Sequence, residues 1–422
     1  MKLAPVEERV LDRLDVAGMV RFASELVQIP SLGGEESPAQ LRVAAWMEEN
    51  GLEVDLWELD LPALKSHQAY SAEIERREGL GLVGALGGAG SGPTLILNGH
   101  VDVVPPGDES AWSFSPWEGR IEGGRVLGRG ALDMKGSLAA GLFATKAIAD
   151  AGVKLQGRLL LQSVIGEEDG GVGTLATLER GYGGDAAVIM EPTGFAVCPA
   201  QAGALNFRLT IRGKSAHGCV RDAGVSALEK YLLVHEELMA LERRRNRSCS
   251  DPLFRGYGIP FPLSVGKIEG GDWASSVPDR VQVEGRYGLP PDEGVEEARQ
   301  EFRDALDRVA IKDAWLSRHP PRLEWWGGCF LPARVPVDTP IVSELSRSLE
   351  DLGGGKPQLK GVTFGSDMRL LVREAGIPAV LFGPGDVRMA HGTDEAVAID
   401  DLVLSARTLA LTALRFCGYE NG

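Results

Sequence analysis

The sequence has little that would suggest a covalent framework. Only five cysteines occur in 422 residues, and no two of them form a CxxC pair. This scarcity argues against a disulfide scaffold or a zinc ribbon and favours a reducing compartment. We therefore expect all five to be packing residues: Cys198, Cys219, Cys249, Cys329 and Cys417.

Long apolar runs and an excess of basic residues are also missing. No run is long enough to span a bilayer, and the charged residues 1–14 lack the apolar segment of a secretory signal. Acidic residues outnumber basic ones by 60 to 44, which gives a net charge of −16. Nucleic acids and anionic membranes are therefore poor candidate partners. The scattered cysteines and the missing signal segment lead us to expect a cytoplasmic location.

One short basic run, 243–247, departs from this acidic balance. It falls at the end of a helical pattern, where cations interact favourably with the helix dipole. We interpret it as a solvated helix end rather than as a binding patch.

The patterning predicts two domains, which the length allows. Up to about residue 192, apolar strand-like runs alternate with helical patterns at 17–27, 38–50 and 135–151. That alternation predicts an α/β fold with a largely parallel sheet covered on both faces. Later strands at 205–211, 263–268 and 280–287 alternate apolar with polar residues, with helical stretches at 223–244 and 294–309. They predict a small inserted α+β domain at 203–318, with 1–202 and 319–422 forming the large domain.

Histidines and carboxylates follow directly on several apolar runs. In an α/β sheet, sites are built where strands end. The inventory of two histidines and several carboxylates suits a pair of divalent metals that share a bridging carboxylate and a water. The segments are Gly99-His100-Val101-Asp102, Gly130-Ala131-Leu132-Asp133, Gly166-Glu167-Glu168, Met190-Glu191-Pro192 and Ala390-His391-Gly392.

Two spacings refine this expectation. Residues i and i+2 of a strand point the same way, so His100 and Asp102 have the pattern of a ligand and its orienting carboxylate. Glu167 and Glu168 are adjacent and point apart, so one can bind metal while the other faces the water as a base. Each motif alone has an ordinary structural explanation, such as a helix cap or a solvated turn, but their joint occurrence does not.

In the order and length of its motifs, the chain resembles the M20 family of metallopeptidases, the group of acetylornithine deacetylase, succinyl-diaminopimelate desuccinylase and carboxypeptidase G. The resemblance covers almost the whole chain. It implies a zinc-exopeptidase-like fold, an inserted lid or dimerisation domain, and a homodimer formed through that domain. The motifs that carry it are Gly99-His100-Val101-Asp102-Val103-Val104-Pro105, Gly128-Arg129-Gly130-Ala131-Leu132-Asp133-Met134-Lys135-Gly136, Gly166-Glu167-Glu168, Glu191-Pro192, Gly213-Lys214-Ser215-Ala216-His217-Gly218 and His391 with Asp394-Glu395.

The resemblance also implies roles for single residues. It implies two divalent ions per subunit, with zinc favoured and cobalt or manganese as alternatives. Glu167 would be the general base and then the acid, and Asp102 would orient His100. The peptide bond between Asp133 and Met134 is expected to be cis. The implied ligands are His100, Asp133 and Glu191 for one ion, and Asp133, Glu168 and His391 for the other, with Asp133 bridging.

Four further residues are candidates for substrate contacts. The resemblance implies that His217 donates to the oxyanion in the partner subunit's site, although it could also be a structural histidine. Ser275 stands where many relatives have asparagine, which puts the usual amide contact in doubt. Arg286 and Arg369 could each clamp a carboxylate, since arginine suits bidentate recognition, or could be surface ion-pair partners.

Three functions remain open from the sequence. The first is the deacylation of an N-acyl amino acid, as in acetylornithine deacetylase. The second is hydrolysis of another N-acyl amine by the same chemistry, with a formylaminopyrimidine, a succinylated diamine or a dipeptide as substrate. The third is an inactive metal-binding relative, which the retained Glu167 and the complete ligand set argue against.

Overall fold

The computed structural model describes residues 3–88, 91–247 and 249–420. The chain divides into two compact units. The large unit comprises Met1–Ala200, Arg334–Lys360 and Ser366–Gly422, and the small unit comprises Gln201–Ala333 and Gly361–Gly365.

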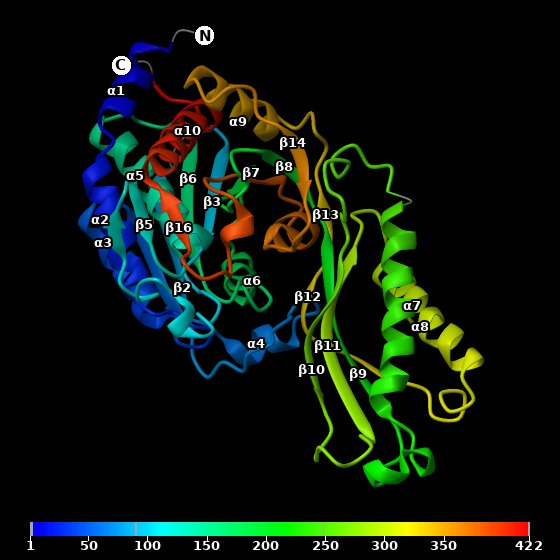
Figure 1. The fold of residues 1–422 in the computed structure, drawn as a ribbon. Coiled ribbons are helices and arrows are strands. Elements are labelled where there is room, and N and C mark those ends of the chain that lie inside the picture. The colour runs from blue at the N-terminus through cyan, green and yellow to red at the C-terminus, as the bar shows by residue number, and fades with distance from the viewer. Residues whose placement is uncertain (1–2, 89–90, 248, 421–422) are drawn as a thin grey trace. The chain divides into compact units, whose positions relative to one another are not determined.

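A nine-stranded sheet forms the centre of the large unit. The neighbouring strands β6, β3, β7 and β15 run parallel, which confirms the predicted α/β class with a largely parallel sheet (Figure 1). In spatial order the strands are β1 (Glu53–Glu58), β2 (Leu80–Gly87), β6 (Arg158–Val164), β3 (Thr94–His100), β7 (Ala186–Ile189), β15 (Ala379–Leu381), β8 (Val197–Gln201) and β13 (Ala333–Arg334), and β14 (Leu359–Val362) pairs with β8.

Helices cover both faces of this sheet. Side chains of β3 alternate between the faces, and Asn98 Nδ2 donates to Thr174 Oγ1 of α6 (Val172–Glu179) at 3.0 Å. On the other face α5 (Gly136–Asp150) packs against α3 (Ser37–Glu49), with the rings of Phe143 and Trp46 4.9 Å apart. The remaining helices of this unit are α1 (Pro5–Asp12), α2 (Val16–Val27), α4 (Leu61–Ser66), α9 (Pro340–Asp351) and α10 (Ile399–Cys417), with short helices η1 (Glu109–Ala111), η2 (Ala131–Lys135), η4 (Leu370–Glu374) and η5 (Val387–Met389).

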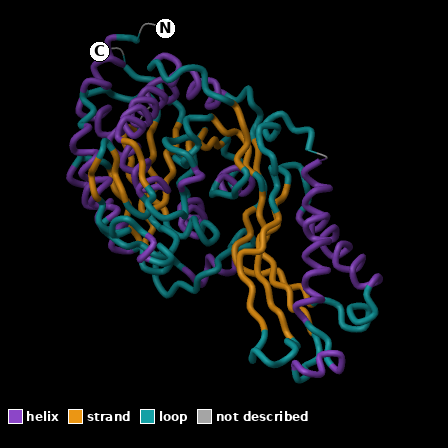
Figure 2. The backbone as a smooth tube through the Cα atoms, in the orientation of Figure 1, coloured by secondary structure: helices purple, strands orange, loops and turns teal. Residues whose placement is uncertain are grey.

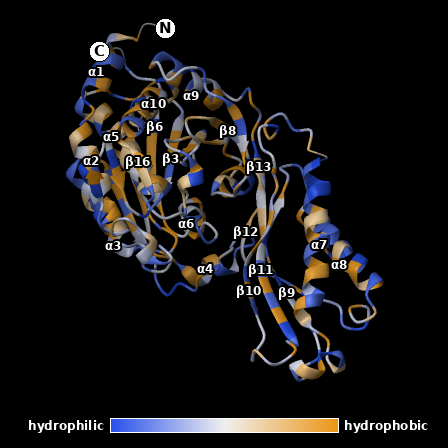
Figure 3. Cartoon of the chain, viewed as in Figure 1, coloured by the Kyte–Doolittle hydropathy of each residue, from blue (hydrophilic) through white to orange (hydrophobic). Residues whose placement is uncertain are grey.

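The sequence of α5 explains its position. It is rich in alanine and leucine and is buried almost all round, as expected for a helix packed between a sheet and other helices. The middle parts of the strands that it covers are apolar, at 95–97 in β3 and 159–161 in β6 (Figure 3). The core of the large unit therefore lies between this layer of helices and the parallel strands.

A second, three-stranded sheet joins distant segments of the large unit. Strand β16 (Ala396–Ala398) pairs antiparallel with β5 (Arg125–Leu127), and β4 (Arg120–Glu122) lies beyond β5. Ala396 stands opposite Leu127. This register brings the segment before β16 next to the glycine-rich segment after β5.

The small unit is an α+β domain, as the alternating pattern predicts. Its antiparallel sheet has the order β10 (Leu263–Gly270), β11 (Arg280–Leu289), β9 (Gly203–Arg212) and β12 (Arg322–Phe330). Helices α7 (Ala227–Arg247) and α8 (Val295–Lys312) accompany this sheet (Figure 2), and the short helix η3 spans Gly218–Ala223. Phe207 packs its ring 4.9 Å from that of Phe302, so the inward side chains of β9 and α8 share one core.

The expected end of the insertion at residue 318 is too early. Strand β12 follows that position and pairs with β9 at 322–325 and again at 329–330, so its backbone hydrogen bonds hold it in the small unit. The segment 361–365 also joins the small unit. The pair Pro320-Pro321 thus precedes one more strand rather than the return to the large unit.

Two other expectations need correction. Cys198 and Cys417 are buried, but Cys219 is exposed and is not a packing residue. Within the basic run, Arg245 is only 8% exposed, and its guanidinium bonds the carboxylates of Glu293 and Glu301. The run is therefore a solvated helix end with one buried ion-pairing member. Among the helices of the described ranges, none is both long and apolar enough to cross a membrane.

Candidate active site

The predicted ligands meet at one edge of the large sheet. His100 ends β3, the Glu167-Glu168 pair follows β6, and Glu191 follows β7. Since these three strands are parallel neighbours, their carboxyl ends lie at the same edge. Asp133 lies within η2, where its peptide bond to Met134 is cis, as predicted.

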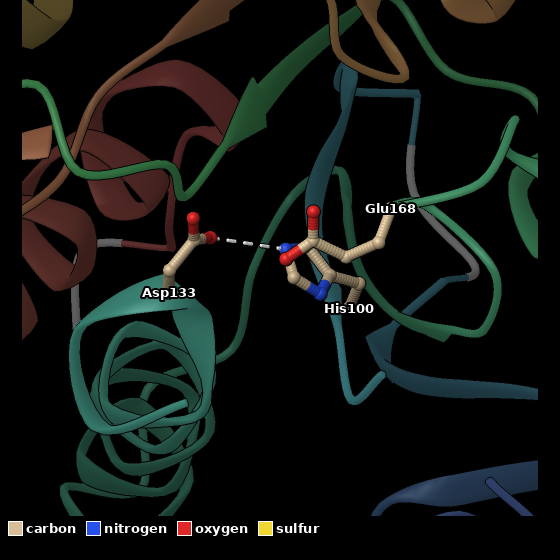
Figure 4. Close-up of side chains that lie close together, drawn as sticks. All are labelled: His100, Asp133 and Glu168. Atoms are coloured by element: carbon tan, nitrogen blue, oxygen red, sulfur yellow. Dashed lines mark hydrogen bonds and ion pairs between the residues drawn. The ribbon is translucent and has the colours of Figure 1, made fainter. Parts of the chain in front are cut away.

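His100 lies at the centre of one cluster. Its Nε2 atom is 3.3 Å from Asp133 Oδ1 and 3.8 Å from Glu191 Oε1. Figure 4 shows the Asp133 carboxylate directed at this imidazole, with Glu168 beside it. Two groups have ligand atoms within 4.8 Å of one another and could hold a metal ion: His100, Asp133 and Glu168, and His100, Glu167 and Glu191.

His391 completes the arrangement from the other side. Its Nε2 atom is 3.1 Å from Glu168 Oε1 and 3.5 Å from Asp133 Oδ2. The two oxygens of Asp133 are therefore each close to a different histidine, as a bridging carboxylate requires. The His391 side chain is 53% exposed, whereas that of His100 is 1% exposed, so one side of the cluster is open to solvent.

The tautomer of His100 follows from its second nitrogen. Nδ1 is 2.9 Å from the backbone carbonyl oxygen of Asp102, which can only accept, so Nδ1 carries the hydrogen. Nε2 is then left with a lone pair directed at the carboxylates. The Asp102 carboxylate is 3.6 Å from Nδ1, beyond a good hydrogen bond, and its Oδ2 accepts from the Glu168 backbone N–H at 3.0 Å.

The electrostatics of the cluster favour a cation. Burial raises the pKa of both Glu167 and Glu191, and neighbouring carboxylates raise each further. Hydrogen bonds to Asp133 and Glu168 raise the pKa of His391 to about 11. None of the cluster's carboxylates forms an ion pair with a lysine or arginine in the described part of the chain. Several buried acids without a lysine or arginine partner suit divalent metal ions that prefer oxygen and nitrogen ligands.

The sequence leaves open whether Arg286 and Arg369 bind a substrate carboxylate or form surface ion pairs, and the structure places them in different environments. Arg369 is 3% exposed and donates to the backbone carbonyls of Ala69 and Gly170, so it holds loops of the large unit in place. Arg286 donates to the Thr363 carbonyl at 3.2 Å, and its burial lowers its pKa. No carboxylate in the described ranges pairs with Arg286.

The small unit brings two other candidates together. His217 caps the start of η3, and its Nδ1 accepts from the Cys219 backbone N–H at 3.1 Å. The next residue, Gly218, donates its N–H to the Ser275 carbonyl oxygen at 2.6 Å. Both His217 and Ser275 are exposed, so they form one accessible surface of this unit.

Sequence reasoning gives no role to several buried charges that surround the site. Arg76, Glu36 and Asp169 form one such network, with Arg76 Nη2 2.7 Å from Asp169 Oδ1 directly after the Glu167-Glu168 pair. A second is the pair of Arg129 and Glu395, whose charged atoms are 2.5 Å apart. For the pair of Arg129 and Glu395 the sequence signal is position, since both lie inside the motifs that supply ligands.

Comparisons with known proteins agree with this geometry. The model of peptidase family M20/M25/M40 matches residues 96–415. An N-formyl-4-amino-5-aminomethyl-2-methylpyrimidine deformylase of Halalkalibacterium halodurans is 32% identical over 77% of this chain and 79% of its own. An acetylornithine deacetylase of Myxococcus xanthus is 32% identical over 81% of this chain and 85% of its own.

Solved structures share the fold of this chain. The crystal structure of human carnosine dipeptidase 1 superposes with a TM-score of 0.78 at 17% identity, covering 99% of this chain and 100% of the other. The matched family model spans most of the chain, including every predicted metal ligand. The chain therefore belongs to peptidase family M20/M25/M40, and it is a hydrolytic enzyme.

Proposed function

We propose that the protein is a dinuclear metal-dependent amidohydrolase that cleaves a small N-acyl amine. The observation that supports this most directly is Asp133, whose two carboxylate oxygens each lie close to a different histidine. We assign His100, Asp133 and Glu191 to one divalent ion and Asp133, Glu168 and His391 to the other. A ligand set of imidazoles and carboxylates without sulfur suits zinc, and cobalt or manganese are the alternatives.

The bound metals would supply a polarised amide carbonyl and a water of lowered pKa. The chain's own residues then handle the protons. Glu167 is 6% exposed and lies beside Glu191 and His100, where it can take a proton from the attacking water and later give it to the leaving amine. The Asp102 carbonyl keeps His100 in the tautomer that leaves Nε2 free.

The relatives and Arg286 support a substrate class. Names of two relatives specify removal of a formyl and an acetyl group from an amine. The acetylated substrate carries a carboxylate and the formylated pyrimidine does not. Arg286 has no carboxylate partner among the described residues, so its guanidinium is available for the carboxylate of an N-acyl amino acid.

A substrate panel tests this proposal and distinguishes an N-acyl amino acid substrate from an N-acyl amine that lacks a carboxylate. Zinc- or cobalt-loaded protein should hydrolyse at least one member of a set of N-acetyl, N-succinyl and N-formyl amines. Arg286→Met should raise KM about 10-fold or more for a carboxylate-bearing substrate, because a charge-assisted hydrogen bond contributes about 1.5–3 kcal/mol. It should leave KM unchanged for the formylaminopyrimidine.

Two outcomes of the same panel would contradict the proposal. No hydrolysis of any N-acyl amine by metal-loaded protein would contradict the proposed class. If Arg286→Met raises KM equally for substrates with and without a carboxylate, Arg286 supports the pocket rather than clamping an anion. Arg322→Met is a suitable control, because this small-unit arginine is 75% exposed and pairs only with Glu324 in the described structure.

We also propose that the protein acts as a cytoplasmic homodimer through the small unit, with His217 completing the partner subunit's site. Mixing Glu167→Ala with His217→Ala, each inactive alone, should restore about a quarter of wild-type sites, since half the dimers are mixed and each has one intact site. The measurement is activity after subunit exchange, with exchange verified by differently tagged chains. A mixture that exchanges but stays inactive would place His217 in its own chain's site, and a His217→Ala variant that is active alone would place His217 outside catalysis.

A further inference from the structure

A buried ion pair lies between the segments that carry Asp133 and His391. Arg129 Nη1 and Glu395 Oε2 are 2.5 Å apart, and the two side chains are 1% and 0% exposed. The pairing of β16 with β5 creates this contact, because it also joins the Gly128 N–H to the Glu395 carbonyl oxygen at 2.9 Å. The pair therefore connects two parts of the chain that are far apart in sequence.

Glu395 holds the backbone of the bridging ligand. Its second oxygen, Oε1, accepts from the backbone N–H of Leu132 at 3.0 Å and from that of Asp133 at 3.1 Å. The Asp133 backbone departs from helical geometry inside η2, so the helix itself does not fix its orientation. One carboxylate thus bonds both Arg129 and the backbone of Asp133.

Arg129 holds the other ligand in the same way. Its Nη2 donates to the backbone carbonyl oxygen of His391 at 3.3 Å. His391 has a φ of 61°, a conformation that residues other than glycine rarely adopt. The ring of Trp112 lies 5.2 Å from the guanidinium, and the adjacent Ser113 donates to Asp394 through its N–H and its hydroxyl. The His391 loop is therefore held from two neighbouring positions.

A buried ion pair by itself is weak evidence for stability, because desolvation offsets its Coulomb attraction. Here each partner also bonds the backbone of a different metal ligand, Glu395 that of Asp133 and Arg129 that of His391. We infer that Arg129 and Glu395 are positioning residues that set the spacing of Asp133 and His391 and thereby the stepwise affinity for the two metal ions. This inference rests on the proposed dinuclear function.

The two partners should have different effects. Arg129→Met removes the hydrogen bond to the His391 carbonyl oxygen. It should therefore lower the affinity for the ion that His391 binds by about 10–100-fold, the usual effect of losing a residue that hydrogen-bonds a metal ligand. Glu395→Gln has the same shape, but its amide cannot accept from both backbone N–H groups and from Arg129 together. Because Asp133 is a ligand of both ions, this substitution should lower the affinity for both.

Stepwise binding of Zn²⁺ to metal-free protein, measured by calorimetry, gives the two affinities separately. The visible spectrum of the Co²⁺-loaded protein reports coordination geometry independently of turnover, and it should change in both variants. Arg129→Lys adds a further distinction: its ammonium can restore the charge contact with Glu395, but as a point charge it cannot make both bonds. It should recover thermal stability more than affinity for the second ion.

Arg415→Met is the matched control. Arg415 lies on α10 and bonds Glu7 at 2.7 Å and Asp351 at 2.8 Å, a multi-carboxylate network of the same kind without a metal ligand. It should lower Tm yet leave both affinities within about twofold of wild type.

The outcomes separate this inference from the proposed function. If wild-type protein does not bind two ions, the proposed function fails first. If wild type binds two ions and folded Glu395→Gln and Arg129→Met bind both with unchanged affinity and unchanged Co²⁺ spectra, the positioning role is overturned. Should Arg129→Met fail to fold, the isosteric Glu395→Gln still decides the question.

Discussion

Glu167→Ala should keep both metal ions and lose about 10²–10⁴-fold in kcat, the usual contribution of a general base. The removed carboxylate takes and returns the proton, whereas Glu168 stands 3.1 Å from His391 and is assigned as the ligand. Metal content and kcat measured on the same preparation test both parts. The acid limb of the pH profile should also disappear from the residual activity, because protonation of Glu167 causes it.

Glu168→Ala is the matched comparison, since the two residues are adjacent and chemically identical. It should lose the ion that His391 binds. The structure makes this contrast necessary, because Glu167 also lies within 4.8 Å of ligand atoms of His100 and Glu191. Loss of metal from Glu167→Ala with full retention in Glu168→Ala would show that the two roles are reversed.

Removing the metals should abolish hydrolysis, and zinc or cobalt should restore it. Without them, no described lysine or arginine pairs with the buried carboxylates of the cluster, and the amide carbonyl has no metal ion to polarise it. The measurement is activity after exhaustive chelation and after titration with each metal. Metal-free protein that turns over substrate at the original rate would contradict the dinuclear proposal.

The metal-free protein should also show a distinctive pH dependence of stability. Burial raises the pKa of Glu167 and Glu191, and the contacts with Asp133 and Glu168 raise the pKa of His391 to about 11. In each case the native state holds a proton that the unfolded chain has released. The free energy of unfolding of metal-free protein should therefore fall as pH rises from about 5 to about 9.

Metal loading should remove most of this slope, because bound cations keep the carboxylates ionised and the histidine neutral at the same pH. Thermal unfolding of both forms across that range gives the comparison. Parallel curves for the two forms would mean that the cluster does not titrate as its burial requires.

Local sequence determined the secondary elements and the chemistry of the ligands. Periodicity located the helices α2, α3, α5, α7 and α8, because an apolar stripe at helical spacing needs only neighbouring residues. It also showed that His100 and the Glu167-Glu168 pair follow buried strands. Parallel pairing then requires their convergence, so the meeting of these residues at one edge was predictable.

Tertiary structure alone decided which residues hold that site in place. Strand β12 belongs to the small unit because it pairs with β9, a contact that its own pattern does not specify. Glu395 reaches Asp133, and Arg129 reaches His391, through the pairing of β16 with β5. Hydrogen bonds between segments so far apart in sequence depend on the three-dimensional register of the strands, whereas the ligand types depend only on the residues themselves.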